Sequence, residues 1–311
     1  MSEKLDQKIF RKFDNLDLLA RQVVEGFITG LHKSPFHGFS VEFAEHRLYN
    51  PGESIRHIDW KLYGRTEKLF VKKFEEETNL RCQIILDSSS SMFFPKMGDQ
   101  SDHLNKIAFS VYSAAAILYM LRKQRDAMGL TVFSDKLETH TPAKSNSVHQ
   151  KMLLAILEQI LKPGEQHLDK KTNTAESLHL IAEKLHQRSL VIIFSDMMDS
   201  NPERINEIFS ALQHLKHNKH EVIVFNVYDH DKEVSLKYKN RPHKFIDMET
   251  GEQIKLNPNE FRDGYKDLVT EYYKKIRLRC MQYKIDFVEA DIKLGFDPVL
   301  TSFLVKRSKL Y

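Results

Sequence analysis

The stretch CQIILDSSSSM, residues 82–92, determines how the rest of the chain is interpreted. Its first five residues form a largely apolar run, which is typical of a strand buried on both faces of a parallel sheet. An aspartate and four serines follow directly. Ligands of open α/β sheets bind beyond the carboxyl ends of the strands, and Asp87 and the serines fall at such an end. The sequence therefore predicts a buried strand that leads into a polar loop where a ligand could bind.

Four more runs rich in valine, isoleucine and phenylalanine follow the first, with helical patterns between them. The runs are MGLTVFS (128–134), SLVIIFSD (189–196), HEVIVFNVYD (220–229) and IDFVEAD (285–291), and the helical patterns cover about 103–124, 147–161, 174–187 and 201–216. Alternation of this kind indicates a sheet with helices on both faces. We therefore predict an α/β fold with a doubly wound, mostly parallel sheet flanked by helices.

The first 79 residues follow a different pattern. Apolar residues at helical spacing predict a helix or a pair of helices over about 4–33. Short alternating runs on either side of the turn-forming NPGES then predict a small β-rich region over 40–80. Much later, two alternating runs around ETG predict a hairpin insertion near 243–257. We expect two domains, 1–79 and 80–311, with the hairpin inside the second.

Composition excludes several classes of function. The 311 residues carry a formal net charge of only +4, which is far from the concentrated basic surface that nucleic-acid binding requires. The longest apolar stretch, VYSAAAILYML (111–121), is too short to cross a bilayer, and the charged amino-terminal segment is unlike a secretory signal. The two cysteines lack a zinc-site spacing. We expect a cytoplasmic protein that has no membrane segment and binds no nucleic acid.

Oxygen-bearing side chains recur at the ends of the predicted strands. Asp87, Ser89 and Ser91, written DxSxS, can point three oxygens towards one centre, and Asp196 ends the next parallel strand. The segment KKTNTAES (170–177) adds Thr172 or Thr174 at the same edge. Hydroxyls with few carboxylates suit Mg²⁺, with Mn²⁺ or Ca²⁺ as alternatives. Such a site keeps one position open for an acidic group from outside, unless a nearby lysine of the same segment, Lys170 or Lys171, enters it.

These motifs resemble the metal-ion-dependent adhesion site of von Willebrand factor A domains, and the similarity covers residues 80–295. The resemblance implies that Ser89 and Ser91 bind the metal directly. It favours Thr172 over Thr174 as a third ligand, because Thr172 opens the TNT triplet. It also implies that Asp87 and Asp196 act through water molecules.

Residues 38–80 resemble a second family signature. The segment GFSVEFAEHRLYNPGESIRHIDWKLYGRTEKLFVKKFEEETNL is similar to that of the bacterial domain-of-unknown-function 58 family, written EF, RxYxPGD, RxIDW and AR. Glu53 stands where the family has aspartate, and Gly64 precedes Arg65 where the family has alanine. Members are associated with MoxR-type AAA+ ATPases that assist protein assembly or activation. The resemblance therefore implies such an ATPase, or its client, as the protein partner.

Three hypotheses of function remain after this comparison. The first is an adaptor, not an enzyme, that uses Mg²⁺ to capture an acidic group of a protein partner. The second is a metal-dependent hydrolase at the same site, although GxSxG, GxGxxG and GxxxxGKS motifs are all absent. The third is a scaffold that binds no metal. We expect the adaptor; metal binding distinguishes it from the scaffold, and the lack of metal-dependent turnover distinguishes it from the hydrolase.

Overall fold

The computed structural model describes residues 15–31, 46–48, 60–72, 80–96, 104–162, 174–198 and 205–308. It divides the chain into two compact units, one of residues 1–29 with 80–311 and one of residues 30–79. The boundary at 79/80 coincides with the predicted one. The amino-terminal helix, however, is grouped with the α/β unit. The assignment of 1–79 to a domain of its own stays a prediction.

The larger unit is built on a six-stranded sheet in the order β10-β7-β6-β3-β4-β5. All neighbouring strands are parallel except β5, which runs antiparallel to β4 at one edge. This confirms the predicted mostly parallel α/β fold. The strands are β3 (Arg81–Asp87), β4 (Ala127–Phe133), β5 (Leu137–Lys144), β6 (Leu190–Ser195), β7 (Glu221–Tyr228) and β10 (Asp286–Asp291).

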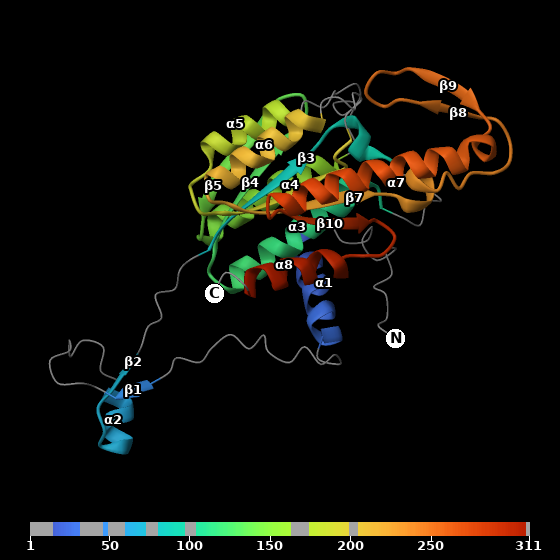
Figure 1. Cartoon of the computed structure of the whole chain (residues 1–311). Helices are drawn as coiled ribbons and strands as arrows, with labels where there is room; N and C mark the ends of the chain where they lie inside the picture. Colours follow the sequence, from blue (N-terminus) through green and yellow to red (C-terminus); the bar gives the residue numbers. More distant parts are fainter. Residues whose placement is uncertain are drawn as a thin grey trace. The chain divides into compact units, whose positions relative to one another are not determined.

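Helices cover both faces of this sheet. On one face α5, α6 and α7 share a continuous apolar core with the strands, and α3 lies on the opposite face with α4 and α8 against it. Figure 1 shows α5 and α6 on one side of the strands and α3 and α8 on the other. The helices are α3 (Lys106–Lys123), α4 (Ser147–Leu161), α5 (Thr174–Lys184), α6 (Ile205–His217), α7 (Pro258–Gln282) and α8 (Asp297–Ser308).

Helix α1 (Leu16–Leu31) packs on the α/β unit through its apolar stripe. Leu16, Leu19, Ala20 and Val23 are buried. The helix start is also tied to α4, because the backbone N–H of Leu16 donates to Glu158 Oε1 at 3.3 Å. The predicted helix over 4–33 is thus confirmed in its described part. Residues 1–14 lie outside the described part of the chain.

The smaller unit contains a short antiparallel pair and one helix in its described part. Strands β1 (His46–Leu48) and β2 (Phe70–Lys72) pair with each other, and α2 (Trp60–Thr66) lies between them in sequence. The two strands agree with the prediction of strands in this region, whereas its β-rich character stays a prediction. The helix is a finding that the sequence pattern did not suggest. The remainder of the signature resembling the 58 family falls outside the described residues.

The predicted hairpin forms between β7 and α7. Strands β8 (His243–Ile246) and β9 (Gln253–Leu256) pair antiparallel as a separate two-stranded sheet, and in Figure 1 they project beyond one end of α7. Gly251 lies in the turn with a φ of 71°, a conformation that glycine adopts without strain. Within the described residues, no helix has the length and apolar character needed to span a bilayer. The cytoplasmic location stays a prediction.

Candidate metal centre at the carboxyl edge of the sheet

The strand order places β3 and β6 at the point where the winding of the sheet reverses. The chain proceeds from β3 to β4 on one side, and from β6 to β7 on the other. In doubly wound sheets the ligand crevice opens at this switch point, beyond the carboxyl ends of the strands. Asp87 is the last residue of β3 and Asp196 directly follows β6. The structure thus places the two predicted aspartates at the ends of adjacent strands.

The serine loop after β3 is ordered by its own hydrogen bonds. Ser88 anchors it, because its backbone N–H and its hydroxyl both donate to the carbonyl oxygen of Phe133, at 2.7 and 2.9 Å. The backbone N–H of Ser89 donates to Asp87 Oδ1 at 2.9 Å, and the hydroxyl oxygens of Ser89 and Ser91 lie 3.1 Å apart. A short 3₁₀ turn, Ser90–Phe93, follows. The loop therefore brings Asp87, Ser89 and Ser91 together, as the DxSxS pattern predicts.

Asp87 is fully buried at this edge and is held by two donors. Besides the N–H of Ser89, the hydroxyl of Ser195 donates to Asp87 Oδ2 at 2.7 Å, and Ser195 Oγ in turn accepts the backbone N–H of Met197. Burial raises the pKa of the Asp87 carboxyl to about 7, and the negative charge of Asp196 adds to the rise, although the two donors oppose it. Asp87 and Asp196 therefore interact through their charges.

Asp196 is also buried. A lysine from α3, the helix on the face of the sheet opposite α5, α6 and α7, contacts it. The ammonium of Lys106, the first residue of α3, donates to Asp196 Oδ2 at 2.9 Å and to Glu233 Oε1 at 2.6 Å. Asp196 Oδ1 accepts the backbone N–H of Met198 at 3.2 Å. Burial alone would lower the pKa of Lys106, but the carboxylates of Asp196 and Glu233 outweigh burial and raise it. Lys106 is therefore charged.

The structure describes only one of the two candidate threonines. Thr172 lies outside the described residues, and so do Lys170 and Lys171. Thr174 is the first residue of α5, with 1% of its surface exposed. Its hydroxyl oxygen is buried without a hydrogen-bond partner in the structure. Buried hydroxyls nearly always have a partner, so an unpaired one near a polar edge indicates a ligand or a water molecule.

The donor set at this edge fits a divalent cation in charge and in chemistry. Asp87, Asp196 and Glu233 carry three negative charges when ionised, against one positive charge on Lys106, which leaves −2. The hydroxyls of Ser89 and Ser91 add neutral oxygens of the kind that Mg²⁺ accepts. A divalent ion here would neutralise the excess negative charge and favour the ionised form of Asp87. The ligand roles themselves remain a prediction.

Sequence reasoning missed Ser195, Lys106 and Glu233. Glu233 lies on a helical turn, η6 (His230–Val234), and its second carboxylate oxygen accepts the backbone N–H of Asp229 at 2.7 Å. The only sequence signal for Lys106 is a charged residue at the start of an otherwise apolar helix. Nothing local pairs it with carboxylates that lie 90 and 127 residues away.

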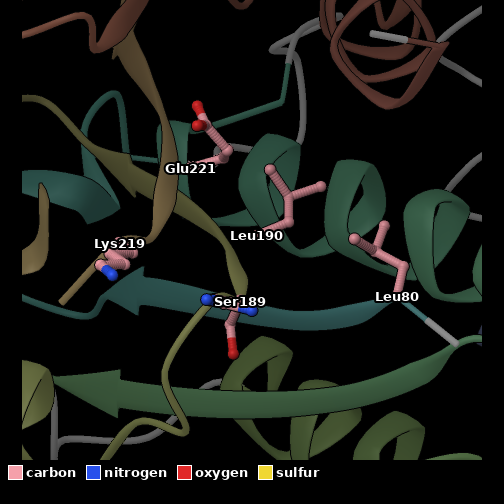
Figure 2. Close-up of a pocket in the computed structure, with 6 residues that line it drawn as sticks. Leu80, Ser189, Leu190, Lys219 and Glu221 are labelled. Atoms are coloured by element: carbon pink, nitrogen blue, oxygen red, sulfur yellow. The ribbon is translucent and has the colours of Figure 1, made fainter. Parts of the chain in front are cut away.

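A separate cavity of about 300 Å³ lies at the other end of the strands, where β6 and β7 begin. Figure 2 labels five of its lining residues, with Glu221 beside Leu190 and with Lys219 and Leu80 on opposite sides of the view. None of the predicted site residues that the structure describes lines it. The lining residues are Leu80, Arg188, Ser189, Leu190, Lys219 and Glu221.

Comparison with family models identifies the class of protein. Residues 45–275 match the model of the family described as "Protein of unknown function DUF58". The match covers well over half of the chain, so the chain belongs to this family. This confirms the resemblance found in the amino-terminal signature. The family description assigns no activity.

The curated relatives are uncharacterized proteins of Mycobacterium bovis and of two strains of Mycobacterium tuberculosis. Each is 24% identical to this chain over 193 residues, which is 62% of this chain and 58% of the relative. The match therefore spans less than two thirds of the length of these relatives. The names of these relatives give no activity.

Solved structures with similar folds include two from Bacteroides. One is an aerotolerance-related membrane protein of Bacteroides fragilis, with 14% identity and a TM-score of 0.47 over 74% of this chain and 99% of that one. The other is the conserved hypothetical protein BatB of Bacteroides thetaiotaomicron, with 17% identity and a TM-score of 0.44 over 74% and 98%. At these TM-scores neither structure informs the function of this chain.

Proposed function

We propose that this protein is a metal-dependent adaptor that holds Mg²⁺ at the carboxyl edge of its sheet and captures an acidic group of a protein partner. The observation that supports this most strongly is the pair Asp87 and Asp196, buried together at the switch point with excess negative charge. Ser89 and Ser91 are the proposed direct ligands, and the two aspartates act through water. Bound Mg²⁺ supplies an electrophilic centre for an external carboxylate.

Thr174 is the proposed third hydroxyl ligand, although the family resemblance favours Thr172. The buried and unpaired oxygen of Thr174 supports this choice, because a cation would satisfy it. Helix α5 also leads into β6, so its first residue lies at the same edge as the ends of the parallel strands. Mn²⁺ or Ca²⁺ could replace Mg²⁺ among the same oxygens.

The partner follows from resemblance. The strand order and the DxSxS loop resemble von Willebrand factor A domains, whose adhesion sites complete the coordination of the metal with an acidic group of another protein. Association of the family with MoxR-type AAA+ ATPases makes such an ATPase, or its client, the proposed partner. An adaptor of this kind needs no catalytic residue.

A metal-free scaffold is the second candidate, and one observation favours it. Lys106 already places a cation on Asp196, so part of the negative charge is neutralised without a metal. A hydrolase has less support. Within the described residues no three histidine, cysteine, aspartate or glutamate side chains are arranged as metal ligands, whereas two-metal hydrolysis uses several such groups.

Calorimetric titration of the chain with MgCl₂ at pH 8 tests the proposal. We expect wild type to bind one ion, and Ser89→Ala to bind at least tenfold more weakly. Ser302→Ala is the control, because its hydroxyl bonds to the Pro298 carbonyl within α8 and not in the serine loop; it should leave the affinity unchanged. Absence of binding by wild type would favour the scaffold.

Partner capture requires a second measurement. The immobilised chain is offered a MoxR-type ATPase from the same genome, in Mg²⁺ or in EDTA. The adaptor predicts capture in Mg²⁺ that is lost in EDTA and in Ser91→Ala. Capture that EDTA leaves unchanged would contradict the metal bridge. Turnover of phosphoester or peptide substrates that requires Mg²⁺ and Ser89 would instead support the hydrolase.

A further inference from the structure

Lys106 occupies a position that the stability of its own helix does not explain. It is the first residue of α3, directly after the helix-capping Asn105, and only 1% of it is exposed. The amino terminus of a helix carries partial positive charge and disfavours a cation. Lysine is also among the residues least often fully buried, unless it is paired. Its location is therefore accounted for by the carboxylates that it contacts.

The contacts of Lys106 restrict what Asp196 can do. Both oxygens of Asp196 already accept hydrogen bonds, Oδ2 from the Lys106 ammonium and Oδ1 from the backbone N–H of Met198. A metal ion that bound Asp196 Oδ2 directly would have to displace an ammonium that is itself buried and is held by a second carboxylate, Glu233. Asp87 differs, because the Ser89 N–H and the Ser195 hydroxyl that donate to it are both neutral.

The charge of Lys106 also opposes a divalent ion at this site. Two cations near the same carboxylate repel each other, and burial weakens the screening by solvent. When all three carboxylates are ionised, Asp87, Asp196 and Glu233 carry −3 without Lys106 and −2 with it, and burial raises the pKa of both Asp87 and Glu233. The ammonium therefore reduces the attraction of the site for a metal ion, yet leaves enough negative charge to balance one divalent cation.

We propose that Lys106 is a built-in competitor of the metal ion: its ammonium keeps Asp196 from direct ligation and holds the affinity for Mg²⁺ low, so that binding is readily reversible. This inference rests on the proposed function and names the residue that regulates the same site. Lys106 is a positioning residue for Asp196. The metal would be released easily unless a partner's acidic group completes the coordination.

The test is Mg²⁺ titration of Lys106→Met by calorimetry at pH 8. We expect the dissociation constant to fall at least tenfold below that of wild type, which corresponds to about 1.4 kcal/mol. A second readout is the melting temperature, which should rise with Mg²⁺ more in the variant than in wild type, because the metal replaces a lost buried cation. Lys106→Gln, whose amide can still donate to Asp196, serves if Lys106→Met does not fold.

The matched control is Arg307→Met. It removes a cation paired with the buried Asp126 at 2.7 Å, at the opposite end of the strands. We expect it to lower stability and to leave Mg²⁺ affinity and the Mg²⁺ dependence of melting unchanged. This control separates loss of a buried ion pair in general from loss of the competitor at the metal site.

The outcomes distinguish this inference from the proposed function. If wild type binds Mg²⁺ and the Lys106 variants bind it no more tightly, the competitor role is overturned while the adaptor stands. If neither wild type nor the Lys106 variants bind Mg²⁺, the adaptor proposal and the competitor proposal both fail. If only the Lys106 variants bind, the ammonium excludes the metal altogether, which supports competition and contradicts metal binding by the wild-type protein.

Discussion

The two ends of the central sheet both carry charged clusters, but their charges are balanced differently. At the amino end, where β7 and β10 begin, Glu221 and Asp286 both bond to Lys306, and Lys216 also approaches Glu221. Burial alone would raise the pKa of Glu221, but Lys306 and Lys216 lower it below its usual value. Two carboxylates face two ammonium groups, and both carboxylates are more than one-third exposed.

The carboxyl end has the opposite balance. The Lys106 ammonium contacts the carboxylates of Asp196 and Glu233, and Asp87, which interacts with Asp196 through its charge, has a pKa that burial raises to about 7. Retaining a buried and unbalanced charge costs stability, so an arrangement of this kind is associated with function more often than a balanced pair is. The comparison supports the proposal that the carboxyl end, and not the amino end, is the binding site.

The largest expected effect on stability comes from comparing the removal of Lys106 at the carboxyl end with the removal of Lys306 at the amino end, both measured in EDTA. Lys106→Met leaves buried carboxylates unpaired and should lower the free energy of unfolding by about 3–5 kcal/mol. Lys306→Met affects partly exposed partners, and we expect a loss of about 1 kcal/mol or less. Urea unfolding measures both. Equal losses would remove the distinction between the two ends.

The pH dependence of stability should have opposite signs at the two ends. The pKa of Asp87 is raised to about 7, so its ionisation opposes folding: its contribution is most favourable below pH 4 and declines as pH rises from 4 to 7. As pH rises over that range, the free energy of unfolding of Asp87→Asn in EDTA should increase by roughly 2–4 kcal/mol relative to that of wild type. Urea unfolding at several pH values measures the difference between the two proteins.

The matched variant at the amino end is Glu221→Gln. The pKa of Glu221 is lowered, so its contribution is present above the unfolded pKa near 4.5 and is lost as pH falls below it. The variant should therefore lose stability relative to wild type at neutral pH and approach it in acid. If the stability difference between variant and wild type changed with pH in the same direction for Asp87→Asn as for Glu221→Gln, the raised pKa of Asp87 would be contradicted.

Removal of a neutral hydrogen-bond donor to Asp87 should change stability less than removal of the Lys106 ammonium. Ser195→Ala deletes the hydroxyl that donates to Asp87 Oδ2 at 2.7 Å and accepts from Met197, and we expect a loss of about 1–3 kcal/mol. Ser302→Ala, at a half-buried hydroxyl on α8 that bonds to the Pro298 carbonyl, is the control, with an expected loss of about 0.5 kcal/mol. Thermal and urea unfolding compare the two variants.

The smallest effect on stability is expected at Thr174. Its hydroxyl has no partner in the structure, so Thr174→Val should change the free energy of unfolding in EDTA by about 0.5 kcal/mol or less, or stabilise the fold. The same change should weaken Mg²⁺ binding at least tenfold if Thr174 is a ligand. Unchanged affinity would return the assignment to Thr172.

The strands and helices that the sequence indicates best are those with a clear apolar pattern. The buried runs that became β3, β6 and β7 were recognised, as were α3, α4, α5 and α6. Strand β5 was missed because it is a partly exposed edge strand without an apolar run. Helix α7 was missed because it is long and largely polar, with only five buried residues.

The candidate site could be predicted only where its residues lie close in sequence or end a recognisable strand. Asp87, Ser89 and Ser91 share one loop, and Asp196 follows an unmistakable buried strand, so their meeting at one edge follows from parallel pairing. The choice between Thr172 and Thr174 stays a prediction, because Thr172 lies outside the described residues and a sequence pattern does not show that the Thr174 hydroxyl is buried. Ser195 was overlooked because a serine that ends a strand has no distinctive signature.

By itself, the sequence determined the sheet and the edge at which its polar loops gather, because alternating buried strands and helices allow few topologies and the carboxyl ends of parallel strands meet on one side. Only the tertiary structure determined that Lys106 reaches Asp196 and Glu233 there. An ion pair between residues that far apart in the chain depends on how α3 and η6 pack beside the strand ends, and that packing is set by the whole core.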